Sequence, residues 1–288
     1  MYQTVHIETH IIEVFTKGTG QPIVLLPGLG SSIEEWRDMI DQLSQHGKVI
    51  TFHRAGLGGS ELGVKTRNAK ETANDLLILL KKLEVSAPII LVGHSYGGFC
   101  AQYFSFTHPS SVKSLVLIES SSMEFELLDE VIGPQTKQSI SMYKALSTFD
   151  SQSIKNQLNL QVMTENIRGS DEKKRNIVEF KSNPKMYEAM ANELENMSND
   201  AHFLKEYDRL SPIPLLIIGR DPNYSVEIMM KQGMPKEKAE SIEEVWQRLI
   251  KDQLTLSSNS RYTMAAGAYH NVHETHPSTI INGILSLL

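Results

Sequence analysis

The chain has 288 residues, of which 40% are hydrophobic and 22% charged, and it is long enough to bury a sizeable core without disulfides or metals. Its formal net charge of −6 and its pI near 5.9 argue against nucleic acid or an anionic membrane as a partner. The single cysteine, Cys100, excludes an intrachain disulfide, and no signal-peptide pattern or membrane-length apolar run is present, so we expect a cytoplasmic protein.

The first 120 residues alternate between short apolar runs and amphipathic segments. Strands are predicted at 5–15, 22–28, 48–54, 88–93 and 111–120, and helices at 31–47, 68–85 and 97–109. In the second of these helices, Leu76, Leu79, Leu80 and Leu83 recur at helical spacing. Apolar strands that alternate with amphipathic helices indicate an α/β fold with a parallel sheet covered on both faces.

The pattern changes after Ser120. Residues 121–210 contain no good strand candidate and are helical in character, whereas the α/β pattern resumes at 213–222. A last strand is predicted at 261–268, followed by a helix at 279–288. We therefore predict one α/β domain, formed by residues 1–120 and 211–288, with a helical cap inserted at 121–210.

A serine stands between glycines where the strand at 88–93 gives way to a helix. The stretch from Gly93 to Gly97 reads GHSYG, which is G-x-S-x-G in a strand–turn–helix context. Such a turn holds its serine in a strained conformation above the sheet edge, and the glycines avoid collisions with neighbouring backbone. We predict that Ser95 is a nucleophile.

A serine hydroxyl needs a base to take its proton. His270 follows the last predicted strand and would approach the turn from above, so it is our preferred base among the ten histidines. His273 and His276 are its competitors. His94 adjoins Ser95, but neighbouring side chains on this turn diverge.

The base in turn needs a carboxylate that orients it and stabilises its charged form. Asp221 stands just beyond the carboxyl end of the strand at 213–220 and is our predicted acid, although Asp-Pro is also a common turn. Glu119, at the end of the strand at 111–120, is the rival, because that strand is expected to neighbour the one that carries Ser95.

The chain resembles the α/β-hydrolase family along nearly its whole length. The resemblance is carried by LLPGLGSS with Trp36, by HRAGLGGS, by LVGHSYGG and by AYHNVHETHP. It implies an eight-stranded, mostly parallel sheet, a helical cap after the sixth strand, and a triad of Ser95, Asp221 and His270. The implied oxyanion hole consists of the backbone N–H groups of Leu29 and Tyr96.

Three positions depart from the pattern of many relatives. Pro27-Gly28 stands where His-Gly is common, so a side chain that often braces the oxyanion loop is missing. Asp221 follows Gly219 by two positions rather than three, which keeps Glu119 open as the acid. Tyr269 replaces a glycine before the catalytic histidine. In HRAGLGGS, we interpret His53 and Arg54 as parts of a structural turn.

Three functional classes fit these residues. The first is a serine hydrolase that cleaves a small to medium, uncharged, apolar ester, or a thioester or amide. The second is a cofactor-free C–C bond hydrolase or lyase that uses the same triad, and the third is a non-catalytic ligand-binding protein. A serine in the turn argues against an aspartate nucleophile. The spacing of histidines and glycines predicts no metal and no cofactor, so the expected partner is a small-molecule substrate.

Overall fold

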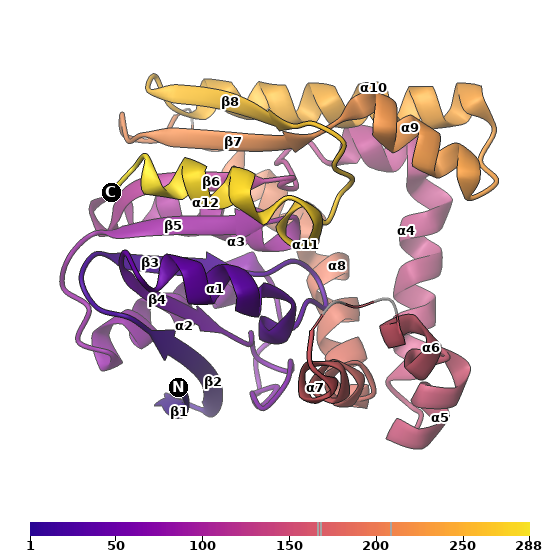
Figure 1. The fold of residues 1–288 in the computed structure, drawn as a ribbon, viewed down its shortest axis with the longest axis horizontal. Coiled ribbons are helices and arrows are strands. Elements are labelled where there is room, and N and C mark those ends of the chain that lie inside the picture. Colours follow the sequence, from indigo (N-terminus) through magenta and orange to yellow (C-terminus); the bar gives the residue numbers. More distant parts are fainter. Residues whose placement is uncertain (166, 168, 208) are drawn as a thin grey trace.

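Eight strands form one sheet at the centre of the protein (Figure 1). The structure, a computed structural model, describes residues 1–165, 167, 169–207 and 209–288. The strands are β1 (Tyr2–Ile7), β2 (His10–Lys17), β3 (Pro22–Leu26), β4 (Lys48–Phe52), β5 (Ile89–His94), β6 (Val112–Ile118), β7 (Leu215–Arg220) and β8 (Ser260–Ala265). Every residue of β3, β5 and β7 is buried, as expected for parallel strands that are covered on both faces.

The strand order places a topological switch point beside β3 and β5. The strands lie in the order β1-β2-β4-β3-β5-β6-β7-β8. β1 and β4 pair antiparallel with β2, and the other neighbouring pairs are parallel. The chain continues from β3 to β4 on one side and from β5 to β6 on the other. Ligands of open α/β sheets bind at such a point, beyond the carboxyl ends of the strands.

Helices cover both faces of the sheet because successive strand residues point to opposite sides. Val24 and Leu26 belong to the core cluster that contains residues of α2 (Ala69–Lys82) and α3 (Tyr96–Thr107). Ile23 and Leu25 belong to the cluster that contains residues of α1 (Arg37–Leu43) and α12 (Pro277–Leu285), which lie in front of the sheet in Figure 1. The short helices are η1 (Ile33–Trp36), η2 (Pro109–Ser111), η3 (Gln253–Leu256) and α11 (Val272–Thr275), of which all but η2 contribute buried residues.

Two groups of helices leave the sheet at the carboxyl ends of the strands, and the last of them, α10, runs back beside β8 (Figure 1). Between β6 and β7 lie α4 (Glu126–Leu146), α5 (Ser151–Gln157), α6 (Leu160–Glu165), α7 (Asp171–Lys181) and α8 (Pro184–Leu204), which we call the helical insertion. Between β7 and β8 lie α9 (Pro222–Lys231) and α10 (Lys236–Asp252). The side chains of Asp150, Ser170 and Asn183 accept backbone N–H groups at the starts of α5, α7 and α8, which explains where these helices begin.

Helix α8 joins the helical insertion to the rest of the protein. Met197, Ala201 and Leu204 belong to the same core cluster as α2 and α3. The Asp200 carboxylate accepts the Ala69 backbone N–H at 2.7 Å, at the start of α2. Apolar packing and a cross-element cap therefore fix this helix in place.

The structure confirms the predicted fold class, an eight-stranded, mostly parallel sheet surrounded by helices. The segment predicted as helical, 121–210, contains helices and no strand among its described residues. In the part of the chain that the structure describes, no helix has the length and apolar character required to cross a bilayer.

Candidate active site

Ser95 occupies a sharp turn between β5 and α3, where the backbone is strained. Its φ of 52° and ψ of −123° lie in a region that residues with side chains seldom adopt. A Cβ atom added to Gly93 would lie 2.5 Å from the Gly97 carbonyl oxygen, and one added to Gly97 would collide with the Leu26 carbonyl oxygen. The two glycines therefore permit the close packing that holds this serine at the end of the sheet.

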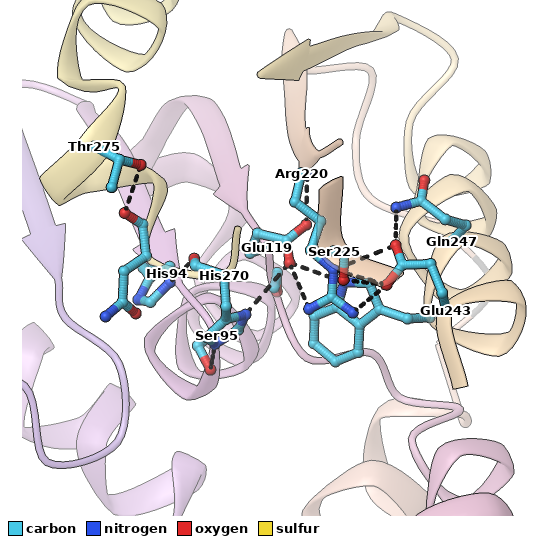
Figure 2. A network of polar contacts seen from close by, with 12 residues as sticks. His94, Ser95, Glu119, Arg220, Ser225, Glu243, Gln247, His270 and Thr275 are labelled. Atoms are coloured by element: carbon cyan, nitrogen blue, oxygen red, sulfur yellow. Dashed lines mark hydrogen bonds and ion pairs between the residues drawn. The ribbon is translucent and has the colours of Figure 1, made fainter. Parts of the chain in front are cut away.

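The His270 ring lies within hydrogen-bond distance of Ser95. Nε2 of His270 is 3.1 Å from Oγ of Ser95, and the side chain of His270 is 30% exposed (Figure 2). His94, buried on the strand side, donates its Nε2–H to the His270 backbone carbonyl at 3.0 Å. The histidine next to the serine thus points away from it and holds the loop that carries His270.

Glu119 is the carboxylate that faces the other nitrogen of His270. Its Oε2 lies 3.3 Å from Nδ1 of His270 and accepts the indole N–H of Trp246 at 2.9 Å. Its Oε1 accepts the backbone N–H of Arg220 at 2.8 Å. Glu119 has no solvent exposure, and its φ of 45° makes it a second strained residue in the site. Strain of this kind clusters at functional sites.

Asp221 does not face His270, contrary to the sequence-based expectation. Its side chain accepts the backbone N–H groups of Asn223 and Tyr224 at the start of α9, and that of Gly267 at 3.0 Å. These hydrogen bonds, that of Gly267 first, lower the pKa of Asp221. Because Asp221 directly follows β7 and Pro222 begins α9, the carboxylate caps that helix.

Arg220, the last residue of β7, balances the buried negative charge of Glu119. The Arg220 guanidinium lies 3.4 Å from Oε2 of Glu119 and 2.6 Å from Oε2 of Glu243. Glu243 in turn accepts the hydroxyl of Ser225 at 2.6 Å and the amide of Gln247 at 2.8 Å, as Figure 2 shows. Buried charges are tolerated when they are paired and hydrogen-bonded in this way. Arg220 also lies 5.3 Å from the centre of the Tyr269 ring, which gives this unexpected tyrosine a packing role.

Sequence reasoning missed the residues that surround Glu119. Trp246 and Glu243 belong to α10, and a tryptophan in an amphipathic helix usually signals core packing. The only local sign in the sequence that Glu119 could take the place of Asp221 was the shortened spacing between Gly219 and Asp221.

The two other candidate bases lie apart from Ser95 Oγ. The His273 ring stacks on Trp36 at 4.3 Å between centroids, and burial lowers its pKa to about 4. His276 makes a hydrogen bond with Thr275 at the start of α12. Burial, followed by the neighbouring His273 and His270, also lowers the pKa of His94 well below its usual value.

A cavity of about 320 Å³ opens beside Ser95, His270 and Leu29. A Cβ atom on Gly28 would lie 3.3 Å from Cβ of Ser95, so the loop after β3 abuts the serine. Tyr96 is the first residue of α3, where backbone N–H groups have no partner within the helix. The structure thus brings together both residues predicted to form an oxyanion hole and the predicted nucleophile.

The far wall of this cavity is charged. Lys181, at the end of α7, lies 2.9 Å from Oε1 of Glu35, and Glu274 also lines the cavity. Ligand atoms of Glu35, His273 and Glu274 lie within 4.8 Å of one another, as in a metal site. However, both Glu35 oxygens are engaged, by Lys181, by the Ser31 hydroxyl and by the Ser32 backbone N–H. We therefore assign the Glu35 carboxylate to an ion pair and a helix cap.

A second, apolar cavity of about 160 Å³ lies beyond Trp246, on the acid side of the site. The Trp246 ring is 5.6 Å from the His270 ring and approaches it edge-on. The apolar lining residues come from the helical insertion and α10: Phe125, Leu128, Ile132, Leu194, Met197, Trp246 and Leu249. Ser95 and His270 thus line the polar cavity, and Trp246 lies between the His270 ring and the apolar one.

A family model described as the alpha/beta hydrolase fold matches residues 21–277. The protein belongs to this family. A 2-hydroxy-6-oxo-2,4-heptadienoate hydrolase of Pseudomonas putida is 33% identical over 132 residues, 43% of this chain and 45% of that enzyme. A soluble epoxide hydrolase of a Corynebacterium species is 33% identical over 104 residues, 36% of each chain. The chain therefore matches less than half the length of each of these relatives.

The structure of a putative epoxide hydrolase from Pseudomonas aeruginosa shares the fold of this family member. The two superpose with a TM-score of 0.74 at 16% identity, over 100% of this chain and 95% of the other. At this identity, the comparison supports the fold alone.

The depressed pKa of His273 predicts a loss of stability in acid. Its pKa is about 4 in the folded protein and 6.5 in its unperturbed state, so the unfolded chain binds the additional proton between these values. The free energy of unfolding therefore contains a contribution of about 3 kcal/mol that depends on neutral His273. This contribution is fully present above pH 6.5 and is lost as the pH falls toward 4. In urea titrations at pH 7 and pH 4, His273→Phe should lose less stability than the wild type. His6→Phe, at an exposed position, should behave like the wild type; an unchanged acid sensitivity in His273→Phe would contradict the prediction.

Proposed function

We propose that the protein is a serine hydrolase that cleaves a carboxylic ester, or a thioester or amide, through Ser95, His270 and Glu119. The observation that carries the proposal is the continuous line of contacts from Oγ of Ser95 through His270 to the buried carboxylate of Glu119. Nucleophile, base and orienting acid are recognised by such geometry rather than by sequence position.

Each residue of the proposed triad has a defined chemical task. His270 Nε2 takes the proton of Ser95 as Oγ attacks the substrate carbonyl carbon, and later returns that proton to the leaving group. Glu119 accepts Nδ1–H of His270, which selects the required tautomer and stabilises the imidazolium. The N–H groups of Leu29 and Tyr96 stabilise the negative oxygen of the tetrahedral intermediate. Water, activated by His270, then hydrolyses the acyl-enzyme.

The helical insertion serves as the cap and supplies much of the substrate pocket. The apolar cavity beyond Trp246 supports a small to medium apolar group on one side of the reacting carbonyl. Lys181, Glu35 and Glu274 line the opposite cavity, so polar groups are expected on the other side. The substrate is therefore proposed to be less uniformly apolar than the sequence alone suggested.

Hydrolysis of a C–C bond is the second candidate. Its support is the similarity to the heptadienoate hydrolase of Pseudomonas putida, and the proposed triad suits this reaction as well. Epoxide hydrolysis through an aspartate nucleophile is disfavoured, because the turn carries Ser95. Parallel assays with p-nitrophenyl esters and a 2-hydroxy-6-oxo-2,4-dienoate distinguish the first two reactions.

A fluorophosphonate probe tests the nucleophile. The purified wild-type protein should be labelled at Ser95, because only an activated serine reacts rapidly with this reagent. Ser95→Ala should fold normally, escape labelling and lose turnover by about a million-fold. Peptide mass spectrometry and ester hydrolysis provide the measurements. Ser95→Ala activity within tenfold of the wild type would refute the assignment.

Two matched carboxylate-to-amide substitutions test the acid. Glu119→Gln should lower kcat by about ten thousand-fold, because the amide no longer selects the tautomer or stabilises the imidazolium. Asp221→Asn should have a mild effect on kcat, since Asp221 contacts backbone N–H groups rather than His270. Circular dichroism controls for folding. The reverse order of effects would restore Asp221 as the acid.

A cavity-filling substitution tests the role of the helical insertion. Ile132→Trp should fill the apolar cavity and lower the rate ratio of hexanoate to acetate esters by about tenfold, with Ser95 still labelled by a small phosphonate. Met142→Trp, on the same helix α4 but 46% exposed, is the control and should preserve the ratio. An unchanged ratio in Ile132→Trp, or loss of labelling in a folded variant, would argue against this pocket.

A further inference from the structure

We propose that Arg54 positions the oxyanion hole and, through Glu193, links it to the helical insertion. The inference rests on the proposed hydrolase function and extends it, because it assigns a task to an arginine that contacts none of the three triad residues and is not itself part of the lining of either cavity. It also identifies what replaces the missing histidine before Gly28.

The Arg54 side chain is aimed at the loop that follows β3. Its Nη1 donates to the Pro27 carbonyl at 2.6 Å, and its Nη2 donates to the Gly28 carbonyl at 3.2 Å. Its guanidinium carbon lies 5.1 Å from the centre of the Tyr96 ring. Arg54 is only 2% exposed, so water does not compete for these contacts. One side chain therefore contacts the first two residues of the loop after β3 and the residue that follows Ser95.

The contact with Gly28 controls the direction of a catalytic N–H group. The Gly28 carbonyl and the Leu29 N–H belong to the same planar trans peptide, in which the two groups point in opposite directions. A hydrogen bond that holds the carbonyl toward Arg54 therefore holds the Leu29 N–H away from it. The Ser31 N–H donates to the same carbonyl at 3.2 Å. Hydrogen bonds to a carbonyl also polarise its amide, which makes the N–H a better donor.

Glu193 fixes Arg54 from the opposite side. Nε of Arg54 lies 2.6 Å from Oε1 of Glu193, and Nη2 lies 3.0 Å from Oε2. This bidentate arrangement is geometrically specific, and both side chains are almost fully buried. Glu193 belongs to α8, whose next residue, Leu194, lines the apolar cavity. The helix that shapes the substrate pocket is thus connected to the proposed oxyanion donor through a single arginine.

A purely structural role does not account for the contacts with the loop. Apolar residues of similar volume often replace buried ion pairs without loss of stability. An apolar pair at positions 54 and 193 has no donors for the Pro27 and Gly28 carbonyls. Stability and catalysis are therefore expected to separate when the pair is replaced, and this separation distinguishes positioning from packing.

The experiment compares Arg54→Lys and the double variant Arg54→Met/Glu193→Met with the wild type. The control is Arg67→Lys, because Arg67 is also buried and paired, with Asp75 at 2.7 Å, outside the site. Active sites are counted by fluorophosphonate labelling carried to completion. Ester kcat and KM per labelled site, the pH profile and inhibition by a trifluoromethyl ketone, which forms a tetrahedral adduct, are then measured.

Both Arg54 variants should lose 10- to 100-fold in kcat and the same factor in ketone affinity, because one oxyanion donor is misdirected. KM should stay within about twofold and the pH profile should be unchanged, since His270 and Glu119 are intact. Arg67→Lys should retain kcat per site. Folded Arg54 variants with wild-type kcat and ketone affinity would overturn the inference. If the wild type itself is not labelled at Ser95, the proposed function fails, and the inference with it.

If the double variant does not fold, Arg54→Lys and Glu193→Gln take its place. Lysine keeps the charge, but its three N–H donors share one compact ammonium nitrogen, so it cannot reproduce the planar fork with which Arg54 reaches two carbonyls and a carboxylate. The decisive result is still kcat per labelled site. A loss that exceeds that of Arg67→Lys supports the inference, and an equal loss overturns it.

Discussion

A carboxylate without solvent exposure at the end of β6 governs the arrangement of the site. Burial of the charged Glu119 is costly unless donors and a counter-charge surround it. The indole of Trp246, the backbone of Arg220 and the ring of His270 provide the donors, and the Arg220 guanidinium provides the charge. Removal of any one of these donors, or of the guanidinium, would leave part of the buried carboxylate unpaired. The strands, the helix and the loop that carry these groups therefore depend on each other.

This constraint explains why two helices follow β7. Arg220 needs a partner beyond Glu119, and Glu243 on α10 provides one at 2.6 Å. Trp246 projects from the same helix, one turn further on, and contacts both the carboxylate and the His270 ring. Asp221 starts the segment by capping α9. The segment between β7 and β8 therefore has two effects. At its start Asp221 caps α9 instead of facing His270, and its second helix, α10, supplies Trp246 and Glu243.

The local pattern of the sequence was sufficient for the fold class and for the positions of Ser95 and His270. A strand, a glycine-flanked turn and a helix are adjacent in the chain, and their geometry follows from steric exclusion over a few residues. The alternation of strands and helices predicted the parallel sheet, because parallel strands need crossover connections that are usually helices. His270 was found by its place after the last strand, which the sheet order brings beside β7.

Only the tertiary structure shows which of the two carboxylates, Asp221 or Glu119, faces His270. Both residues follow parallel strands and both carry a carboxylate, so the sequence left the two open. The deciding contacts join Glu119 to Trp246 and His270, which are 127 and 151 residues away along the chain. The same holds for Arg54, whose partner Glu193 is 139 residues distant. Sequence patterns report periodicity and local backbone preferences, whereas the partner of a buried charge depends on which distant segments the fold brings together.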